Sequence, residues 1–348
     1  MNPYITMILL SSLGLGTALT FMSSHWLLAW MGLEINTLAI LPLMAQHHHP
    51  RAVEATTKYF LAQAAAAATI LFASTINAWS TGEWNIHCLS HPMATTLVTM
   101  ALALKVGLAP MHFWMPPVMQ GLDLPTGLLM ATWQKLAPFA LIIQMAPTTN
   151  PSLLMTLGLL STIIGGWNGL NQTQLRKILA YSSIAHLGWM IIVVQFSPQL
   201  TILTLALYIL MTATTFMTFK LMASTKINTL SMSWTKAPII TTTATLALLS
   251  LGGLPPLTGF MPKWLILQEL TMQKLPLTAT IMALSALLSL YFYLRLCYSM
   301  TLTISPNTNN ASTPWRLQNT QTTMPLATLM AMTLLLLPLT PLAQMLVT

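Results

Sequence analysis

Charge is what this 348-residue chain has least of. Only 5% of its residues are charged, whereas ordinary soluble domains carry about 25%. Hydrophobic residues make up 55% of the sequence. Such a chain cannot cover a core with a water-solvated surface, so the bilayer must serve as its solvent. Because a spanning backbone must satisfy its own polar groups, we expect an all-α polytopic membrane protein.

Acidic residues are scarcer than basic ones, with five Asp and Glu against 13 Lys and Arg. The basic residues form no run and no patch with interleaved aromatics, which excludes a nucleic-acid-binding protein. The two cysteines, Cys88 and Cys297, are far apart and form no CxxC motif, which excludes an iron–sulfur cluster or a zinc site. The sequence has no Walker or GxGxxG motif, so we expect no nucleotide, cofactor or metal on this chain.

Long apolar runs are abundant. Runs of about 20 apolar residues are typical of membrane-spanning helices. The ninth run is too long for one straight span, since 35 residues would reach roughly 50 Å against a core of about 30 Å. Glycines and prolines interrupt it, so we interpret it as a broken helix. Eleven spans are predicted: 4–22, 25–45, 59–79, 93–114, 125–146, 152–170, 175–196, 199–222, 237–271, 275–299 and 324–346.

The distribution of cations between these spans predicts the orientation. Loops that follow even-numbered spans, with the adjoining helix ends, contain nine Lys and Arg, and loops that follow odd-numbered spans contain only Lys274. By the positive-inside rule the even loops and the N-terminus face the matrix or cytoplasm, and the C-terminus faces the opposite side. The nine cations are Arg51, Lys58, Arg176, Lys177, Lys220, Lys226, Lys236, Arg295 and Arg316.

A short internal repeat joins the two Gly/Pro-interrupted spans. Segments 106–116 and 252–262 agree at five of eleven positions, at a constant offset of 146 residues. That offset corresponds to five spans, so the two copies would have opposite orientations, as in many transporters. We therefore expect one membrane domain, 1–348, made of inverted five-helix repeats at 1–146 and 152–299 and a C-terminal helix at 324–346. Chance similarity between two Pro/Gly-rich apolar segments is the alternative.

Four charged residues lie inside the apolar runs: Glu34, Lys105, Lys135 and Lys263. A charge at mid-membrane costs roughly 2.5–3.5 kcal/mol on insertion scales, so each is a functional-site candidate. Lysine can release its proton when it is buried, and His186 lies in another span as a possible relay. We predict that these five residues carry protons, with Glu34 within salt-bridge or one-water distance of Lys105. The alternative for each is a structural role, as a salt bridge or a hydrogen-bonded buried side chain.

Several motifs carry a resemblance to a known family. They are MGLEINTLAILPLM around Glu34, KVGLAPMHFWMPPVMQGL from Lys105, WQKLAPF around Lys135, LRKILAYSSIAHLGWM from Leu175 and GGLPPLTGFMPKW up to Trp264. Together, in this order and along essentially the whole chain, they resemble the antiporter-like membrane subunits of respiratory complex I. These subunits are related to those of multi-component cation/proton antiporters.

The resemblance implies a fold of two inverted five-helix bundles, each with a discontinuous helix. It places the family's glutamate–lysine pair on Glu34 and Lys105, its central lysine on Lys135, its exit-side lysine on Lys263 and a central polar position on His186. It further implies a multi-pass subunit of the mitochondrial inner membrane. In that membrane the cation distribution predicts an N-terminus in the matrix and a C-terminus in the intermembrane space.

In such a complex, proton translocation is coupled to electron transfer from NADH to ubiquinone. The expected partners are other membrane subunits, neighbouring antiporter-like chains and phospholipids such as cardiolipin. NADH, FMN, the iron–sulfur clusters and ubiquinone would bind to other subunits, with no redox chemistry in this chain. Two alternatives stay open: a stand-alone cation/proton antiporter, and a purely structural membrane subunit whose buried charges only pack helices.

Overall fold

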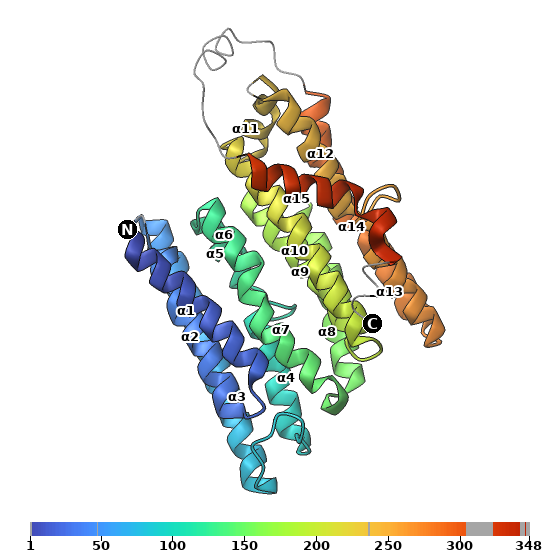
Figure 1. Cartoon of the computed structure of the whole chain (residues 1–348). Coiled ribbons are helices and arrows are strands. Elements are labelled where there is room, and N and C mark those ends of the chain that lie inside the picture. Colours follow the sequence, from blue (N-terminus) through green and yellow to red (C-terminus); the bar gives the residue numbers. More distant parts are fainter. Residues whose placement is uncertain (1, 47, 236, 304–322, 342–344, 346–348) are drawn as a thin grey trace. The chain divides into compact units, whose positions relative to one another are not determined.

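The computed structural model describes residues 2–46, 48–235, 237–303, 323–341 and 345 (Figure 1). These residues form helices and connecting turns, and no β-strand occurs among them. The chain divides into two compact units, Met1–Ser161 and Thr162–Thr348, with the boundary inside one helix. The all-α membrane architecture expected from the composition is therefore confirmed.

The first unit holds seven helices and the start of an eighth. Most of them have proline at the first or second position, where its fixed φ and missing N–H suit the first turn of a helix. The elements are α1 (Pro3–Met22), α2 (Trp26–Met44), α3 (Pro50–Thr81), α4 (Pro92–Val106), α5 (Met115–Gly121), α6 (Leu124–Ala131), α7 (Trp133–Met145), a 3₁₀ turn (Ala146–Thr148) and α8 (Pro151–Gly169), which crosses the boundary.

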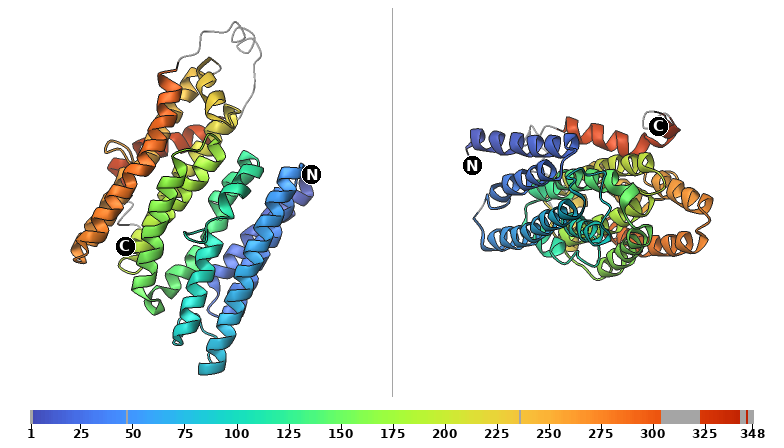
Figure 2. Two further views of the ribbon diagram at one scale, coloured as in Figure 1. Left: turned by 180° about the vertical axis from the view of Figure 1, so that it is seen from behind. Right: turned by 90° about the horizontal axis from the view of Figure 1, so that it is seen from below.

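Among its described residues the second unit continues with seven further helices, seen from behind in Figure 2. Helix α14 packs against α12 and α13, and α10 packs against α9, α12 and α15. The elements are α9 (Leu175–Val193), α10 (Pro198–Leu221), α11 (Ile227–Ser231), a 3₁₀ turn (Met232–Thr235), α12 (Pro238–Gly252), α13 (Phe260–Met272), α14 (Pro276–Thr301), α15 (Met324–Leu335) and a 3₁₀ turn (Leu337–Leu339).

The eleven predicted spans correspond in order to these helices. Six described helical segments are long and apolar enough to cross a membrane, and one of them, Leu124–Thr148, joins α6, α7 and the 3₁₀ turn that follows. Two details differ from the prediction. The fifth span is interrupted at Thr132, and Arg51 and Lys58 lie in the first turns of α3 rather than in a loop. Lys236, Arg316 and part of the C-terminal span 324–346 lie outside the described residues.

Hydroxyl side chains inside the helices donate hydrogen bonds to backbone carbonyls of their own helix. Thr17 donates to the carbonyl of Gly14 at 2.8 Å, and Thr20 donates to that of Thr17 at 2.8 Å. The same i to i−3 bond recurs along the other helices, for example from Ser161 to Gly158. These bonds remove the cost of placing a bare hydroxyl in an apolar medium, which explains how so many threonines fit in the spans.

Helices α1 and α2 approach closely because glycine lies on both sides of their contact. A Cβ atom at Gly16 would lie 2.4 Å from Oδ1 of Asn36 and 2.9 Å from the carbonyl oxygen of Gly32. A Cβ atom at Gly32 would lie 2.7 Å from Cγ2 of Thr20. Small residues of this kind let the backbones of membrane helices pack together. The contact brings Asn36 against the backbone of α1.

Candidate functional site

The first discontinuous helix breaks directly after Lys105. Helix α4 ends at Gly107, whose φ of 86° and ψ of 42° are left-handed, and α5 begins at Met115. The exposed carbonyls of the last turn are satisfied by side chains from other segments. The indole of Trp114 donates to Leu104 O at 2.9 Å, and the amide of Gln63 on α3 donates to Lys105 O at 3.3 Å. These hydrogen bonds stabilise the end of α4 and so the interruption of the helix.

The second discontinuous helix repeats this geometry 146 residues later. Helices α4 and α12 each have 15 residues, each begins at a proline, and each ends before a left-handed glycine. Gly253 has a φ of 83° and a ψ of 44°, close to the values at Gly107. In both helices the N–H of this glycine returns to the carbonyl four residues earlier. The internal similarity in the sequence therefore corresponds to the same local backbone structure.

Different side chains complete the two breaks. In the second unit Lys263, in the first turn of α13, donates from Nζ to the carbonyl of Gly252 at 2.7 Å. Its ammonium group thus lies at the C-terminal end of α12, where the helix dipole favours a positive charge. In the first unit the equivalent capping role belongs to Trp114, and the ammonium group of Lys105 makes no hydrogen bond to the end of α4. The lysine at each break therefore has a different environment.

Lys105 and Lys135 line one buried cavity in the first unit, although they come from α4 and α7. Both are almost fully buried, with exposed fractions of 6% and 4%. The cavity leaves about 10 Å³ for the centre of a water-sized molecule. Its walls combine apolar side chains with uncharged polar ones. The polar residues beside the two lysines are Asn36, Thr37, Tyr59, Gln63 and Gln134.

A chain of hydrogen bonds runs along this cavity. The hydroxyl of Tyr59 donates to Oε1 of Gln134 at 3.4 Å, and Nε2 of Gln134 donates to the carbonyl of Asn36 at 3.3 Å. The carboxamide of Asn36 and Nζ of Lys105 are buried without a hydrogen-bond partner on the protein. Only charged residues and histidine were predicted from the sequence as site residues, and Asn36, Tyr59, Gln63 and Gln134 were not identified. The sequence did contain a signal for these four residues, because each is a polar residue inside an apolar run.

Glu34 lies in the middle of α2, as predicted, and is half-buried. Its Oε2 accepts a hydrogen bond from the hydroxyl of Thr37 at 3.4 Å. The carboxylate is close enough to act electrostatically on Lys105 and on Tyr59. However, Nζ of Lys105 makes no hydrogen bond to it. The two groups thus interact electrostatically without a direct hydrogen bond, and their expected pairing across one water stays a prediction.

His186 belongs to the second unit, where α9 presents it half-buried. Its Nδ1 lies 2.7 Å from the carbonyl oxygen of Ser182, and its ring lies 5.7 Å from that of Tyr208. A carbonyl can only accept, so Nδ1 carries a proton and the neutral ring presents Nε2 as an acceptor. Such a histidine can take up and release a proton at Nε2. The structure thus places Glu34, Lys105 and Lys135 in the first unit and His186 and Lys263 in the second.

Family comparison decides what kind of protein carries this site. A family model described as the membrane part of NADH:quinone oxidoreductase and Mrp antiporters matches residues 23–289. The chain belongs to this family. A second model, described as the C-terminus of NADH dehydrogenase subunit 2, matches residues 290–344.

Individual members of the NADH:quinone oxidoreductase/Mrp antiporter family agree along the full length. The chain is 74% identical over 341 residues to NADH-ubiquinone oxidoreductase chain 2 of Formosania lacustris, covering 98% of each. It is 70% identical over 348 residues to chain 2 of Salmo salar, covering 100% of each. Respiratory complex I of Thermus thermophilus contains a chain of the same fold, with a TM-score of 0.87 and 28% identity, over 99% of this chain and 80% of that one.

Proposed function

We propose that this chain is a core membrane subunit of respiratory complex I and contributes to proton translocation across the inner mitochondrial membrane. The translocation is coupled to electron transfer from NADH to ubiquinone. The observation that most supports this function is the burial of Lys105 and Lys135 along one polar cavity of the first unit. A buried lysine can release its proton, so two such residues along one polar cavity can exchange protons.

Each of the five residues has a separate role in this proposal. Glu34 acts on Lys105 electrostatically. Protonation of Glu34 therefore removes a negative charge that stabilises the ammonium group of Lys105. Lys135 is the next proton carrier in the first unit. His186 and Lys263 continue the same chemistry in the second unit. The inverted repeats 1–146 and 152–299 provide the two discontinuous helices on which Lys105 and Lys263 depend.

The remaining functions are assigned to partners. NADH, FMN, the iron–sulfur clusters and ubiquinone would bind to other subunits, and this chain would act as part of a translocase without redox chemistry of its own. Its neighbours would be further antiporter-like membrane subunits and phospholipids such as cardiolipin. The cation distribution supports an N-terminus in the matrix and a C-terminus in the intermembrane space.

Lys135→Met tests the proposal, since it keeps most of the side-chain length and removes the charge. We expect the assembled complex to lose much of its proton translocation while the hydrophilic part still oxidises NADH with an artificial acceptor. Lys220→Met, at an exposed position in the last turn of α10, is the matched control and should pump normally. An assembled Lys135→Met complex with normal quinone reduction and an unchanged proton-to-electron ratio would contradict the proposal and favour a purely structural subunit.

A further inference from the structure

Asn36 is the most unusual uncharged residue of the first unit. Its side chain is only 3% exposed, and both its carboxamide oxygen and its carboxamide nitrogen lack a hydrogen-bond partner on the protein. A buried polar group without a partner destabilises the folded protein, and an amide brings two such groups. A residue of this kind normally interacts with a bound molecule that can both donate and accept.

The position of Asn36 identifies that molecule. It lines the same cavity as Lys105, whose Nζ is also buried without a hydrogen-bond partner. The space left for the centre of a water-sized molecule, about 10 Å³, is close to the minimum for one water. A buried water requires two to four polar partners. The amide oxygen, the amide nitrogen and the ammonium group supply three.

The packing of Asn36 shows why the amide is held in place. Its Oδ1 lies over Gly16 of α1, where a Cβ atom would come within 2.4 Å. Its backbone carbonyl accepts the hydrogen bond from Gln134, the residue directly before Lys135. The side chain is thus held from one side by α1, and its backbone is tied to α7. Neither contact satisfies the carboxamide itself.

We propose that Asn36 is a positioning residue that binds one water molecule against the ammonium group of Lys105. The water accepts from Lys105 and donates to the amide oxygen, and the amide nitrogen donates to the water. Lys105 then stays solvated inside the protein without an ion pair. The inference rests on the proposed role of Lys105 in proton transfer and adds the group that keeps this lysine hydrated.

Maps of the assembled complex at a resolution that shows ordered waters test this site directly. We expect one water within hydrogen-bond distance of both the Asn36 amide and Nζ of Lys105. It should be absent in Asn36→Leu, which is apolar and of similar size. It should remain in Asn36→Asp, which keeps an acceptor oxygen. Ile40→Leu, one turn along α2 at a buried position outside the cavity, is the control and should retain it.

Proton pumping gives the second readout. Asn36→Leu should lower the proton-to-electron ratio at least twofold, Asn36→Asp should restore most of it, and Ile40→Leu should leave it unchanged. A wild-type map without this water, or a water that persists in Asn36→Leu, would overturn the inference. If Asn36→Leu does not assemble, the wild-type and Asn36→Asp maps still decide the question. The proposed function fails separately, through normal pumping by Lys135→Met.

Discussion

Lys263 donates a 2.7 Å hydrogen bond from its ammonium group to the carbonyl oxygen of Gly252, the last residue of α12. One side chain thus connects the two halves of the discontinuous helix. The aliphatic part of Lys263 also packs against Gly253, where a Cβ atom would lie 2.9 Å from its Cδ and Nζ. A residue expected only to carry a proton is therefore also part of the structure of the break.

This double role predicts that stability and pumping can be separated at Lys263. Lys263→Gln retains an N–H donor but has no proton to release, and Lys263→Met has neither. Because a hydrogen bond from a charged donor contributes about 1.5–3 kcal/mol, we expect thermal stability to fall in the order wild type, Gln, Met. Both variants should lose pumping. Heat inactivation and proton-to-electron ratios of the assembled complex measure the two effects, and equal stability of the two variants would contradict the capping role.

Glycine at position 253 should be more sensitive to substitution than an ordinary left-handed glycine. Gly82 has a φ of 78° with open space around its missing Cβ, so Gly82→Ala carries only the backbone penalty, about 1–2 kcal/mol. Gly253→Ala carries the same penalty and also meets Lys263. We expect a larger loss of thermal stability for Gly253→Ala. Comparable melting curves for the two variants would show that Lys263 moves aside freely.

The contact between α1 and α2 predicts a contrast between two nearby glycines. A Cβ atom at Gly16 would meet the Asn36 side chain and the carbonyl of Gly32, whereas a Cβ atom at Gly14 would meet nothing within 4 Å. Gly16→Ala should therefore separate the two helices and reduce the amount of assembled complex severalfold, with Gly14→Ala near wild type. Native gel electrophoresis measures this difference. Equal amounts of complex would mean that α1 can shift without cost.

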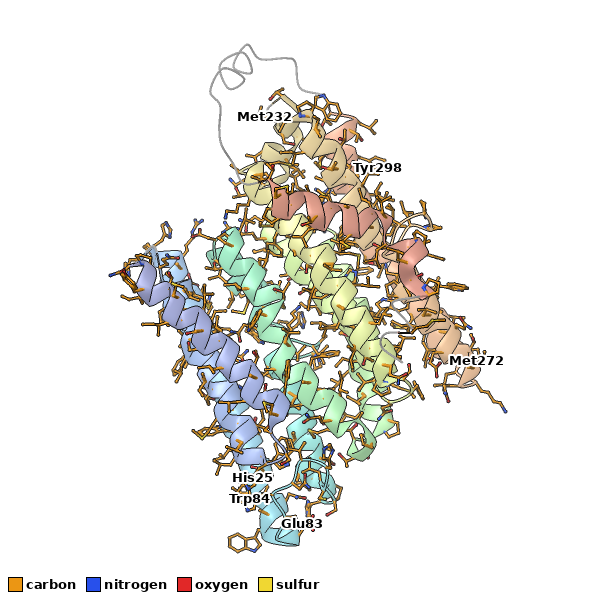
Figure 3. All side chains as sticks on the ribbon, viewed as in Figure 1. His25, Glu83, Trp84, Met232, Met272 and Tyr298 are labelled. Carbon is orange, nitrogen blue, oxygen red and sulfur yellow. The ribbon has the colours of Figure 1, made fainter. Side chains whose placement is uncertain are left out.

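The loop between α3 and α4 allows a test of orientation. Figure 3 shows His25 and Trp84 side by side at this end of the first unit, with ring centroids 5.6 Å apart. Cys88 in this loop is exposed, whereas Cys297 is buried. In mitoplasts a membrane-impermeant maleimide should label Cys88, because the loop follows the third span and, in the proposed orientation, faces the intermembrane space. Labelling only after the inner membrane is opened would reverse the predicted orientation.

The same labelling experiment has a predicted pH dependence. A hydrogen bond to Glu83 raises the pKa of the Cys88 thiol, and the carboxylate charge acts in the same direction. Less of the reactive thiolate is then present at neutral pH. Glu83→Gln should lower this pKa, increase the labelling rate and move the rate–pH curve to lower pH. An unchanged curve would show that Glu83 does not act on the thiol.

Much of the fold was predictable because it depends on local properties of the chain. Scarce charge required a membrane environment, apolar runs marked the helices, and glycine and proline marked both breaks. The charged candidates were visible for the same reason, since a lysine such as Lys135 stands out in an apolar run. The interruption at Thr132 was not predicted, because no glycine directly precedes it and the next proline is six residues further on.

What only the tertiary structure decided is which polar groups meet. Lys105 and Lys135 share a cavity although 30 residues separate them, and Asn36 and Gln134 meet across 98 residues. Glu34 and Lys105 form no direct hydrogen bond, and the indole of Trp114 caps α4. Apolar periodicity shows that a helix is buried but says little about its rotation against a neighbour. That rotation depends on close contacts such as Gly16 against Asn36, and it determines which side chains face the same cavity.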